Sequence, residues 1–424
     1  MRVLWLCNIM LPVIAAQLGL PCSNKEGWLS GLVARVRQDG PGDMTLGVCF
    51  PVSGEAIQGE TDGIFWYGFP EDTGRPHLYG KGLEAALGRI LEAFMPDIVH
   101  CFGTEYPHTL AMARVYNRPQ RTLIGIQGLC FVYAEAYMAG LPERVRRGMT
   151  VRDFLRQDTL TQQQRKYRER GRFEIEALRR SGHVTGRTDW DRQWAARVNP
   201  DAAYHFMNET LRESFYGPVW NENACRPCSI FVSQGNYPIK GLHYLLEAMP
   251  RIKRHYPMAH LFVAGDEITR ASTVKERLKL SGYGRYLQEL IRTHHLEKAV
   301  TFLGRLNEKE MLGRFLESHV FVSPSAIENS PNSVGEAMLL GMPVISSDVG
   351  GVHNMLLTGL EGILYPPGDV KALADWICYV FDRKNQVEIA EMGRSARLRA
   401  LHTHDPETNY RRLLEIYHEI NLCV

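Results

Sequence analysis

The feature that most constrains this chain is an alternation of short apolar runs with helix-length segments, which occurs in two successive sets. The strand-like runs of the first set are Val3–Cys7, Thr45–Phe50, Ile98–Cys101, Arg121–Ile126 and His183–Gly186. Those of the second set are Ser229–Val232, His260–Ala264, Val300–Leu303, Val320–Pro324 and Pro343–Ser346. Such alternation predicts parallel sheets covered by helices. Two sets predict an α/β protein with two doubly wound, Rossmann-like domains.

The domain boundaries follow from the break between the two sets. A chain of 424 residues is too long for one ordinary core. The segment Met207–Pro227 contains Gly217 followed by Pro218 and is predicted to be a linker. We therefore expect a first domain over residues 1–207, a second over 227–399, and a C-terminal segment over 400–424.

Bulk composition excludes several classes of protein. No apolar run approaches the ~20 residues of a membrane span, and the N-terminal run lacks a small-residue cleavage site for secretion. The formal net charge of +2 gives no general argument for nucleic acid. Nine scattered cysteines suit reduced thiols, and Cys225 and Cys228 lack the second pair that a zinc site would need. We expect a cytoplasmic protein.

A basic helical insertion interrupts the first set over residues 142–180, with 12 Lys and Arg against 6 Asp and Glu. One interpretation is a solvated helical face. Another is a surface for anionic lipid or for an anionic acceptor, which would place the protein at the inner face of the membrane. Nucleic acid is the third, but no recognised nucleic-acid motif accompanies the charge.

The most informative segment is Ser323–Met338, in which Glu328 follows a strand and Glu336 lies on the next helix. That helix is predicted to begin around Ser330, with Pro331 in its first turn. The first N–H groups of such a helix can bind a phosphate or sugar oxygen. Carboxylates on either side of the phosphate could bind the ribose and the hexose of a nucleotide sugar. The plain alternative is an ordinary helix with two surface glutamates.

A second segment, Val232–Leu242, follows the first strand of the second domain. Gly235 and Pro238 are predicted to make a tight loop there, and Lys240 is predicted to open a helix. A lysine beside a helix N-terminus is a compact cation that suits a diphosphate. The segment is not a Walker loop, because the glycine and serine or threonine positions of that motif are missing.

These two segments, in this order and spacing, resemble the retaining GT-B glycosyltransferases with a Glu-x7-Glu motif, a family that includes bacterial mannosyltransferases and sucrose synthases. Similar segments occur along nearly the whole chain and are Glu26–Trp28, Arg187–Arg192, Val263–Asp266 and Phe302–Gly304. The resemblance implies two facing Rossmann-like domains. It also implies that the C-terminal helix, about Pro406–Leu422, crosses back onto the first domain.

The resemblance implies a role for each donor-site residue. Glu336 would hold the ribose hydroxyls, and Lys240 would neutralise the diphosphate. Glu328, with the backbone of Asn332 and Ser333, would hold the transferred sugar. The remaining donor-binding residues that we expect are Gly27, Gly235, Asn236, Arg187 and Arg305. No metal ion and no cofactor is implied, since the nucleotide sugar is itself the donor substrate.

Two departures from the family pattern concern charged groups. Many members carry an arginine where Gly235 stands, so one phosphate-binding cation is either missing here or supplied elsewhere, with Arg187 and Arg305 as the candidates. Many also carry a histidine where Gln127 stands, and an amide cannot accept a proton near neutral pH. We expect Gln127, His100 and Glu105 on the acceptor side.

The segment Asp189–Asp191 imitates a metal-binding Asp-x-Asp motif. Thr188 and Asp191, three residues apart, instead predict a helix capping box.

The sequence thus predicts a retaining transferase that moves a sugar from a nucleoside diphosphate to an acceptor hydroxyl, plausibly in polysaccharide or glycolipid synthesis. The acceptor would be a carbohydrate or a lipid-linked molecule. Two alternatives remain. One is another GT-B enzyme, either a phosphorylase or a sugar-nucleotide epimerase. The other is a non-catalytic protein that binds sugar nucleotides.

Overall fold

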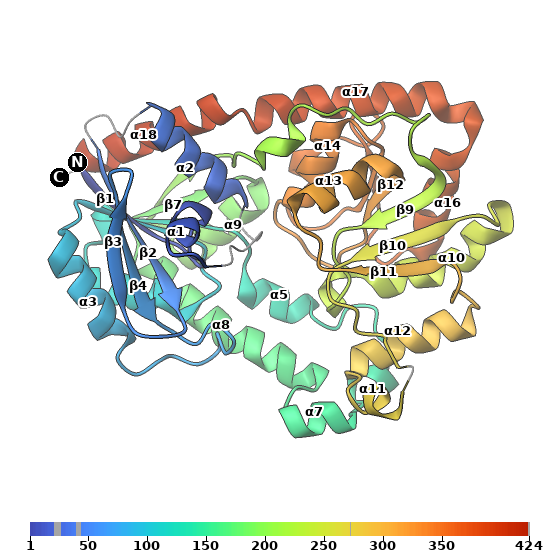
Figure 1. Cartoon of the computed structure of the whole chain (residues 1–424), viewed down its shortest axis with the longest axis horizontal. Coiled ribbons are helices and arrows are strands. Elements are labelled where there is room, and N and C mark those ends of the chain that lie inside the picture. Colours follow the sequence, from blue (N-terminus) through green and yellow to red (C-terminus); the bar gives the residue numbers. More distant parts are fainter. Residues whose placement is uncertain (21–26, 40–43, 272, 423–424) are drawn as a thin grey trace. The chain divides into compact units, whose positions relative to one another are not determined.

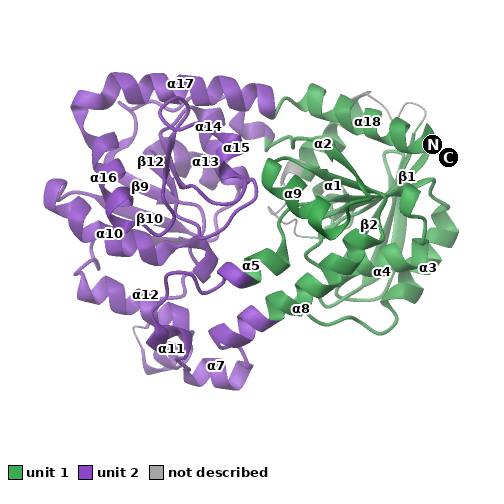
Figure 2. Cartoon of the chain, turned by 180° about the vertical axis from the view of Figure 1, so that it is seen from behind, with its two compact units in different colours: residues 1–134, 166–212, 404–424 green, residues 135–165, 213–403 purple. Residues whose placement is uncertain are grey.

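A computed structural model describes residues 1–20, 27–39, 44–271 and 273–422. The chain folds into two compact units (Figure 2). The first comprises residues 1–134, 166–212 and 404–424, and the second comprises residues 135–165 and 213–403. The basic insertion is therefore divided at residue 165 between the two units, whereas we had assigned all of it to the first domain.

The first unit is built on a sheet (Figure 1), and its eight described strands run in the order β3-β4-β2-β1-β5-β6-β7-β8. The β3–β4 pair is antiparallel, and the other neighbours are parallel. The strands are β1 (Arg2–Leu6), β2 (Thr45–Val52), β3 (Ile57–Thr61), β4 (Ile64–Pro70), β5 (Ile98–Phe102), β6 (Thr122–Gly125), β7 (His183–Gly186) and β8 (Ala203–Phe206). Central strands such as β5 are buried along their whole length, as expected for a sheet covered on both faces.

Helices surround this sheet. They are α1 (Pro12–Gln17), α2 (Gly27–Asp39), α3 (Leu83–Phe94), α4 (Pro107–Tyr116), α9 (Asp189–Val198) and α18 (Pro406–Leu422). The helices α5 (Cys130–Ala136) and α8 (Leu160–Arg179) each begin in one unit and end in the other. The predicted capping box is present at α9, where Thr188 and Asp191 bind each other's backbone N–H groups.

The C-terminal helix α18 belongs to the first unit, although the chain reaches it from the second. Its buried side chains recur at helical spacing and include Leu413, Ile416, Tyr417 and Ile420. They join the hydrophobic core that holds Val3 and Trp5 of β1. The helix contacts α2 and β5.

The second unit holds a sheet of six described strands, all parallel, in the order β11-β10-β9-β12-β13-β14. They are β9 (Arg226–Val232), β10 (His260–Ala264), β11 (Val300–Gly304), β12 (Ser318–Ser323), β13 (Val344–Ser347) and β14 (Ile363–Tyr365). Its longer helices are α10 (Leu242–His255), α12 (Gly282–Thr293), α13 (Glu308–Glu317), α14 (Asn332–Leu340), α16 (Val370–Phe381) and α17 (Gln386–Thr403). The short helices are α6 (Glu143–Arg146), α7 (Val151–Arg156), α11 (Val274–Leu278) and α15 (Val352–Met355).

All ten predicted strands are present, and the described residues form four further strands that were not predicted. These are β3, β4, β8 and β14. A local signal marks the first two, because Asp62 and Gly63 both have positive φ and join β3 to β4. Asp-Gly between strand-like runs is a strong hairpin signal. No helix in the described part of the chain is long and apolar enough to cross a membrane.

Candidate active site

Lys240 and Glu328 meet at the carboxyl edge of the second sheet. Lys240 ends a short 3-10 turn after β9, and Glu328 lies in the loop after β12. The Lys240 Nζ atom lies 2.5 Å from Glu328 Oε1, and Ser325 Oγ donates to the same oxygen over 2.7 Å. The side chains of Lys240 and Glu328 are 20% and 8% exposed. A ligand can therefore reach the cation of this pair more easily than the anion.

Direct contact between two backbone segments brings these residues together. Gly241 has a φ of +69°, and a Cβ atom there would lie 1.8 Å from the carbonyl oxygen of Pro324. Only glycine fits so close an approach in this conformation. Beside it, the Ala326 N–H donates to the carbonyl oxygen of Ile239 over 2.7 Å. The loop that carries Lys240 is thus fixed against the loop that leads to Glu328.

Two further contacts hold the Glu328 loop from the side of β13. The Gly351 N–H donates to the Glu328 carbonyl oxygen over 3.1 Å, and Ser347 Oγ donates to the Ser325 carbonyl oxygen over 2.5 Å. The residues Glu328 and Glu336 are 6% and 5% exposed. The plain alternative of an ordinary helix with two surface glutamates is therefore wrong, because both residues are buried.

Helix α14 begins two residues later than predicted. Pro331 is its N-cap, in an extended conformation, and the Pro331 carbonyl oxygen accepts from the N–H of Val334. Asn332 and Ser333 therefore form the first turn, and both are partly exposed. The N–H groups of a first turn have no partner within their own helix and carry a partial positive charge. Glu336 follows one turn later on the same helix.

The loop after β9 explains the missing family arginine. A Cβ atom at Gly235 would lie 2.7 Å from Leu242 Cδ2 and 3.0 Å from Val263 Cγ1. A long side chain at this position would have to displace those core atoms. The neighbouring Asn236 has a buried Oδ1 atom without a hydrogen-bond partner in the described structure. An amide oxygen in this state can accept from a ligand hydroxyl.

Arg305 lies after β11, next to the end of β10. Its guanidinium makes two hydrogen bonds to the Asp266 carboxylate, over 2.6 and 2.8 Å. The Arg305 side chain is largely exposed. It can therefore turn toward a ligand only by giving up a bidentate pair with Asp266.

Arg187 and Gln127, both predicted site residues, come together in the first unit with Glu209, which was not predicted. Arg187 follows β7 and forms an ion pair with Glu209. Gln127 Nε2 donates to Glu209 Oε1 over 2.6 Å. The Arg187 and Glu209 side chains are 6% and 4% exposed. The Arg187 cation is thus neutralised within the first unit.

His100 is in the core of the first unit and is fully buried. Its Nδ1 atom lies 2.7 Å from Tyr417 Oη, and that oxygen accepts from Trp5 Nε1 over 2.8 Å. Burial lowers the pKa of His100 to about 3, so the ring is neutral. The expectation that His100 lies on the acceptor side is wrong for this structure, because Tyr417 of α18 contacts the buried ring.

Glu105 is partly buried after β5, and burial raises the pKa of its carboxyl group. Its neighbour Thr104 donates to Glu174 on α8, a fully buried carboxyl group. Burial raises the pKa of Glu174 to about 8. Glu105 Oε2 has no hydrogen-bond partner in the described structure.

Sequence reasoning missed a buried polar chain at the end of β4. Glu71 follows that strand directly, and its Oε2 atom lies 2.6 Å from His108 Nδ1. His108 Nε2 in turn lies 2.9 Å from Asn8 Oδ1. Glu71 lines a cavity of about 690 Å³, and its Oε1 has no partner in the described structure. The Asp62-Gly63 hairpin signal would have revealed β4 and hence the polar residue after it.

Gly27 opens helix α2, but the loop before it lies outside the described residues. Among the described residues, no group of three or more His, Cys, Asp and Glu side chains could hold a metal ion.

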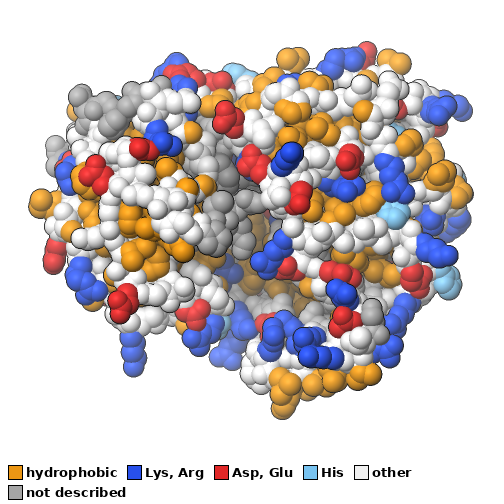
Figure 3. All heavy atoms as spheres, viewed as in Figure 1, with side chains coloured by type: hydrophobic (Ala, Val, Ile, Leu, Met, Phe, Trp, Pro, Cys, Tyr) orange, Lys and Arg blue, Asp and Glu red, His pale blue; other side chains and the backbone are white. Residues whose placement is uncertain are grey.

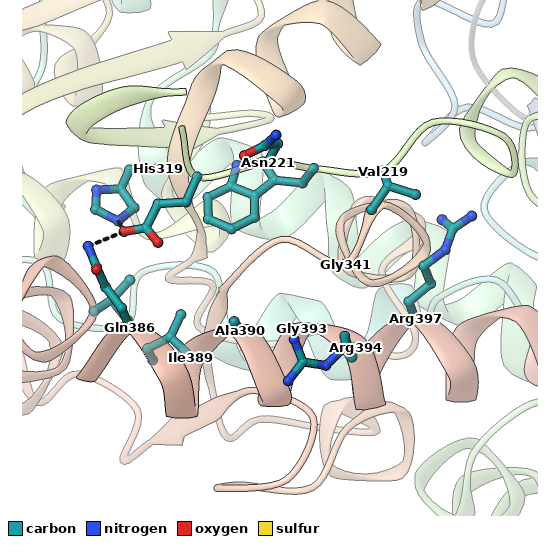
Figure 4. A pocket seen from close by; sticks show the side chains of 13 residues that line it. Val219, Asn221, His319, Gly341, Gln386, Ile389, Ala390, Gly393, Arg394 and Arg397 are labelled. Carbon is teal, nitrogen blue, oxygen red and sulfur yellow. Dashed lines mark hydrogen bonds and ion pairs between the residues drawn. The ribbon is translucent and has the colours of Figure 1, made fainter. Parts of the chain in front are cut away.

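Another cavity, of about 440 Å³, lies elsewhere in the second unit (Figure 4). It is lined by the segment Val219–Glu222, by His319 and by residues of α17 such as Gln386. His319 lies near the start of β12, whereas Glu328 follows the end of that strand. The cavity is therefore at the opposite edge of the sheet from the Lys240–Glu328 pair.

Comparison with known proteins concerns the same region. Residues 226–383 match the family described as glycosyl transferases group 1. This matched segment contains Lys240, Glu328 and Glu336. Glycogen synthase of Mycobacterium tuberculosis (strain CDC 1551 / Oshkosh) is 27% identical over 212 residues, which are 49% of this chain and 47% of the relative. The chain thus spans about half the length of the curated relatives it matches.

Solved structures match along nearly the whole chain. Sucrose-phosphate synthase from Thermosynechococcus elongatus has a TM-score of 0.67 at 15% identity, covering 99% of this chain and 98% of that one. Anabaena Alr3699/HepE in complex with UDP and glucose has a TM-score of 0.66 at 15% identity, covering 99% and 100%. The fold is thus that of the GT-B glycosyltransferases, with two parallel-sheet domains.

Proposed function

We propose that this protein is a glycosyltransferase that moves a sugar from a nucleoside diphosphate to an acceptor hydroxyl. The observation that carries the proposal is the Lys240–Glu328 pair, whose lysine stays partly exposed, in the loops that lead to α10 and α14 inside the matched group 1 segment. Lys240 and the α14 N–H groups supply positive charge for a diphosphate. Glu336, one turn along α14, supplies a carboxylate for ribose hydroxyls.

Each group has a separate part in the proposed reaction. The bond between the sugar anomeric carbon and the diphosphate oxygen breaks, and the acceptor oxygen bonds to that carbon. Negative charge grows on the leaving diphosphate, and Lys240 stabilises it, which is usually a large term in catalysis. Glu328 binds hydroxyls of the transferred sugar. Glu336 binds a part of the donor that does not change during the reaction.

We further propose that the anomeric configuration is retained, with the acceptor attacking from the face that the diphosphate leaves. A leaving diphosphate oxygen then accepts the acceptor proton, so no protein nucleophile is needed. A glycosidase-like pair of carboxylates would be the competing mechanism. It fits poorly because Glu336 is assigned to the ribose. We propose that neither a metal ion nor an organic cofactor takes part, since Lys240 and α14 already provide charge.

The donor assignment can be tested by calorimetric binding of UDP and UDP-glucose, chosen because the Anabaena relative is described with UDP-glucose. Glu336→Ala should weaken UDP binding about 10- to 100-fold, because that is the change in Kd expected when hydrogen bonds to a charged group are lost. Uniform binding loss raises KM more than it lowers kcat. Glu297→Ala, at an exposed glutamate outside the site, is the control.

If Glu336→Ala bound UDP as tightly as the native protein, the donor would not bind at Glu336. If neither nucleotide binds the native protein, the same pair of measurements should be repeated with guanosine and adenosine diphosphates before the donor site is rejected. Transfer of sugar to an added acceptor, followed by NMR of the new linkage, separates a retaining transferase from an epimerase or a non-catalytic binder.

A further inference from the structure

Large apolar side chains are exposed on two short segments of the second unit, residues 143–156 and 273–279, here called the tip. Phe154 is 58% exposed, Leu155 and Val274 are each 73% exposed, and Met149, Val151 and Leu278 are also more than half exposed. These six are a third of the eighteen large apolar side chains exposed in the described chain. Figure 3 shows hydrophobic side chains gathered at the bottom of the view, where Figure 1 labels α7 and α11. So dense a cluster marks an interaction site.

Contacts within the second unit orient α7 so that the apolar side chains of the tip point into solvent. The N-cap of α7 is Thr150, whose side chain accepts from the Asp153 N–H. Asp153 is buried, and its Oδ2 atom accepts from the Gly282 N–H at the start of α12 over 2.8 Å. The polar side of α7 thus packs inward, and Phe154 and Leu155 face solvent. Helix α11 ends four residues before Gly282, which places it beside this anchor.

The tip is also strongly basic, with eight Lys and Arg against three Asp and Glu. Each acidic residue is already paired, Glu143 with Arg147, Asp153 with Arg152 and Glu276 with Arg270. Arg156, Lys275 and Lys279 are exposed and have no acidic partner among the described residues. Exposed apolar groups with unpaired cations around them match the two components of an anionic lipid interface, acyl chains and phosphate headgroups.

We propose that the tip docks on an anionic membrane surface, with Phe154, Leu155 and their neighbours inserted at the level of the headgroups. The helices of the described chain are unable to span a bilayer, so the attachment is interfacial. A second copy of the chain is a poorer occupant, because self-association through the tip would bring two cationic surfaces together. This inference does not depend on sugar transfer, although it would keep the enzyme next to a lipid-linked acceptor.

The test is sedimentation of the full chain with vesicles made of equal parts phosphatidylglycerol and phosphatidylcholine, compared with pure phosphatidylcholine. Phe154→Ser with Leu155→Ser should weaken binding to the anionic vesicles at least about tenfold, since most of each side chain would lose its apolar burial. Arg156→Glu with Lys275→Glu and Lys279→Glu should weaken it on the order of 100-fold, or about fivefold or more for each cation. Added salt should weaken native binding.

Two matched controls separate the tip from general effects. Val387→Ser with Leu398→Ser removes equally exposed apolar groups from α17. Lys298→Glu with Lys309→Glu and Lys371→Glu makes the same change in net charge at exposed sites outside the tip. Both controls should bind vesicles like the native protein, and hydrogen exchange should slow on vesicle binding only in peptides covering 143–156 and 273–279.

Several results would overturn the proposal. Native-like vesicle binding by both tip variants would do so, as would an equal loss in the charge control. So would a change of oligomeric state in Phe154→Ser with Leu155→Ser that leaves vesicle binding unchanged, which would assign the tip to a second copy. Melting temperature and UDP binding should be unchanged in every variant, which keeps a failure here distinct from a failure of the donor site.

Discussion

The carboxyl edges of the two sheets carry similar residue types in opposite states. At the second sheet, Lys240 pairs with Glu328, and its side chain remains 20% exposed. At the first sheet, Arg187 and Glu209 are almost completely buried as a pair. His108 with Glu71, and Glu174 with Thr104, are buried in the same way. The charged groups at the two edges therefore differ in how far they are exposed to solvent.

The physical difference is access to a competing partner. The two charges of a buried ion pair are not solvated by water. Separating them leaves an uncompensated charge in the interior, so the pair rarely dissociates. An accessible lysine can exchange its carboxylate partner for a diphosphate at much lower cost. The comparison predicts that substitutions at the second edge change ligand handling, and that substitutions at the first edge change stability.

The largest expected effect is at Lys240. Lys240→Ala should lower kcat on the order of 10²–10³-fold, by analogy with removing one donor that stabilises transition-state charge. Glu328→Gln should reduce turnover and relax the choice among donor sugars while UDP still binds. Steady-state kinetics with a panel of nucleotide sugars measures both. If Lys240→Ala kept a normal kcat and lowered the melting temperature instead, Lys240 would be a stabilising residue like those at the first edge, and the prediction would be wrong.

The next effect concerns pH and the first edge. Burial raises the folded-state pKa of Glu174 to about 8, above the ordinary value of a glutamate in the unfolded chain. The folded state therefore holds this proton more tightly. Its stability should fall as pH rises from about 4.5 to about 8 and then level off. Glu174→Gln cannot ionise, so relative to the native protein it should gain on the order of 4–5 kcal/mol across this window.

Urea unfolding of both proteins at the two ends of the window measures this difference. Glu176→Gln is the matched control on the same helix. Hydrogen bonding to Arg114 lowers the pKa of Glu176, so its contribution is lost only below the window. The Glu176→Gln difference from the native protein should stay constant across the window. If the difference in free energy of unfolding between Glu174→Gln and the native protein were also independent of pH, Glu174 would have to be in contact with solvent.

The smallest expected effect tests His100 through its partner. Tyr417→Phe removes the hydroxyl that binds both Trp5 and His100 in the core. Loss of these buried hydrogen bonds should lower the free energy of unfolding by about 1–2 kcal/mol. UDP binding should not change. Tyr379→Phe, whose hydroxyl binds the exposed Glu388, should cost less. An unchanged stability with altered acceptor turnover would return His100 to the acceptor side.

Much of the fold was predictable because its signals are local. The ten predicted strands and the amphipathic C-terminal helix each depend on the spacing of apolar residues within a short segment. Four strands were missed. The Asp62-Gly63 turn is the local signal that marks β3 and β4, and it also locates Glu71, which directly follows β4.

Some features of the candidate site were also predictable from local sequence, and others depend on the tertiary structure. The sequence alone singled out Lys240, Glu328 and Glu336, because each follows a strand end or a helix start that local pattern marks. Tertiary structure decided that Lys240 pairs with Glu328, through a Gly241–Pro324 approach between loops far apart in sequence. It also decided that α18 buries His100, by bringing Tyr417 onto β5. Periodicity depends on neighbouring residues, whereas exposure and pairing of a polar group depend on which distant segment covers it.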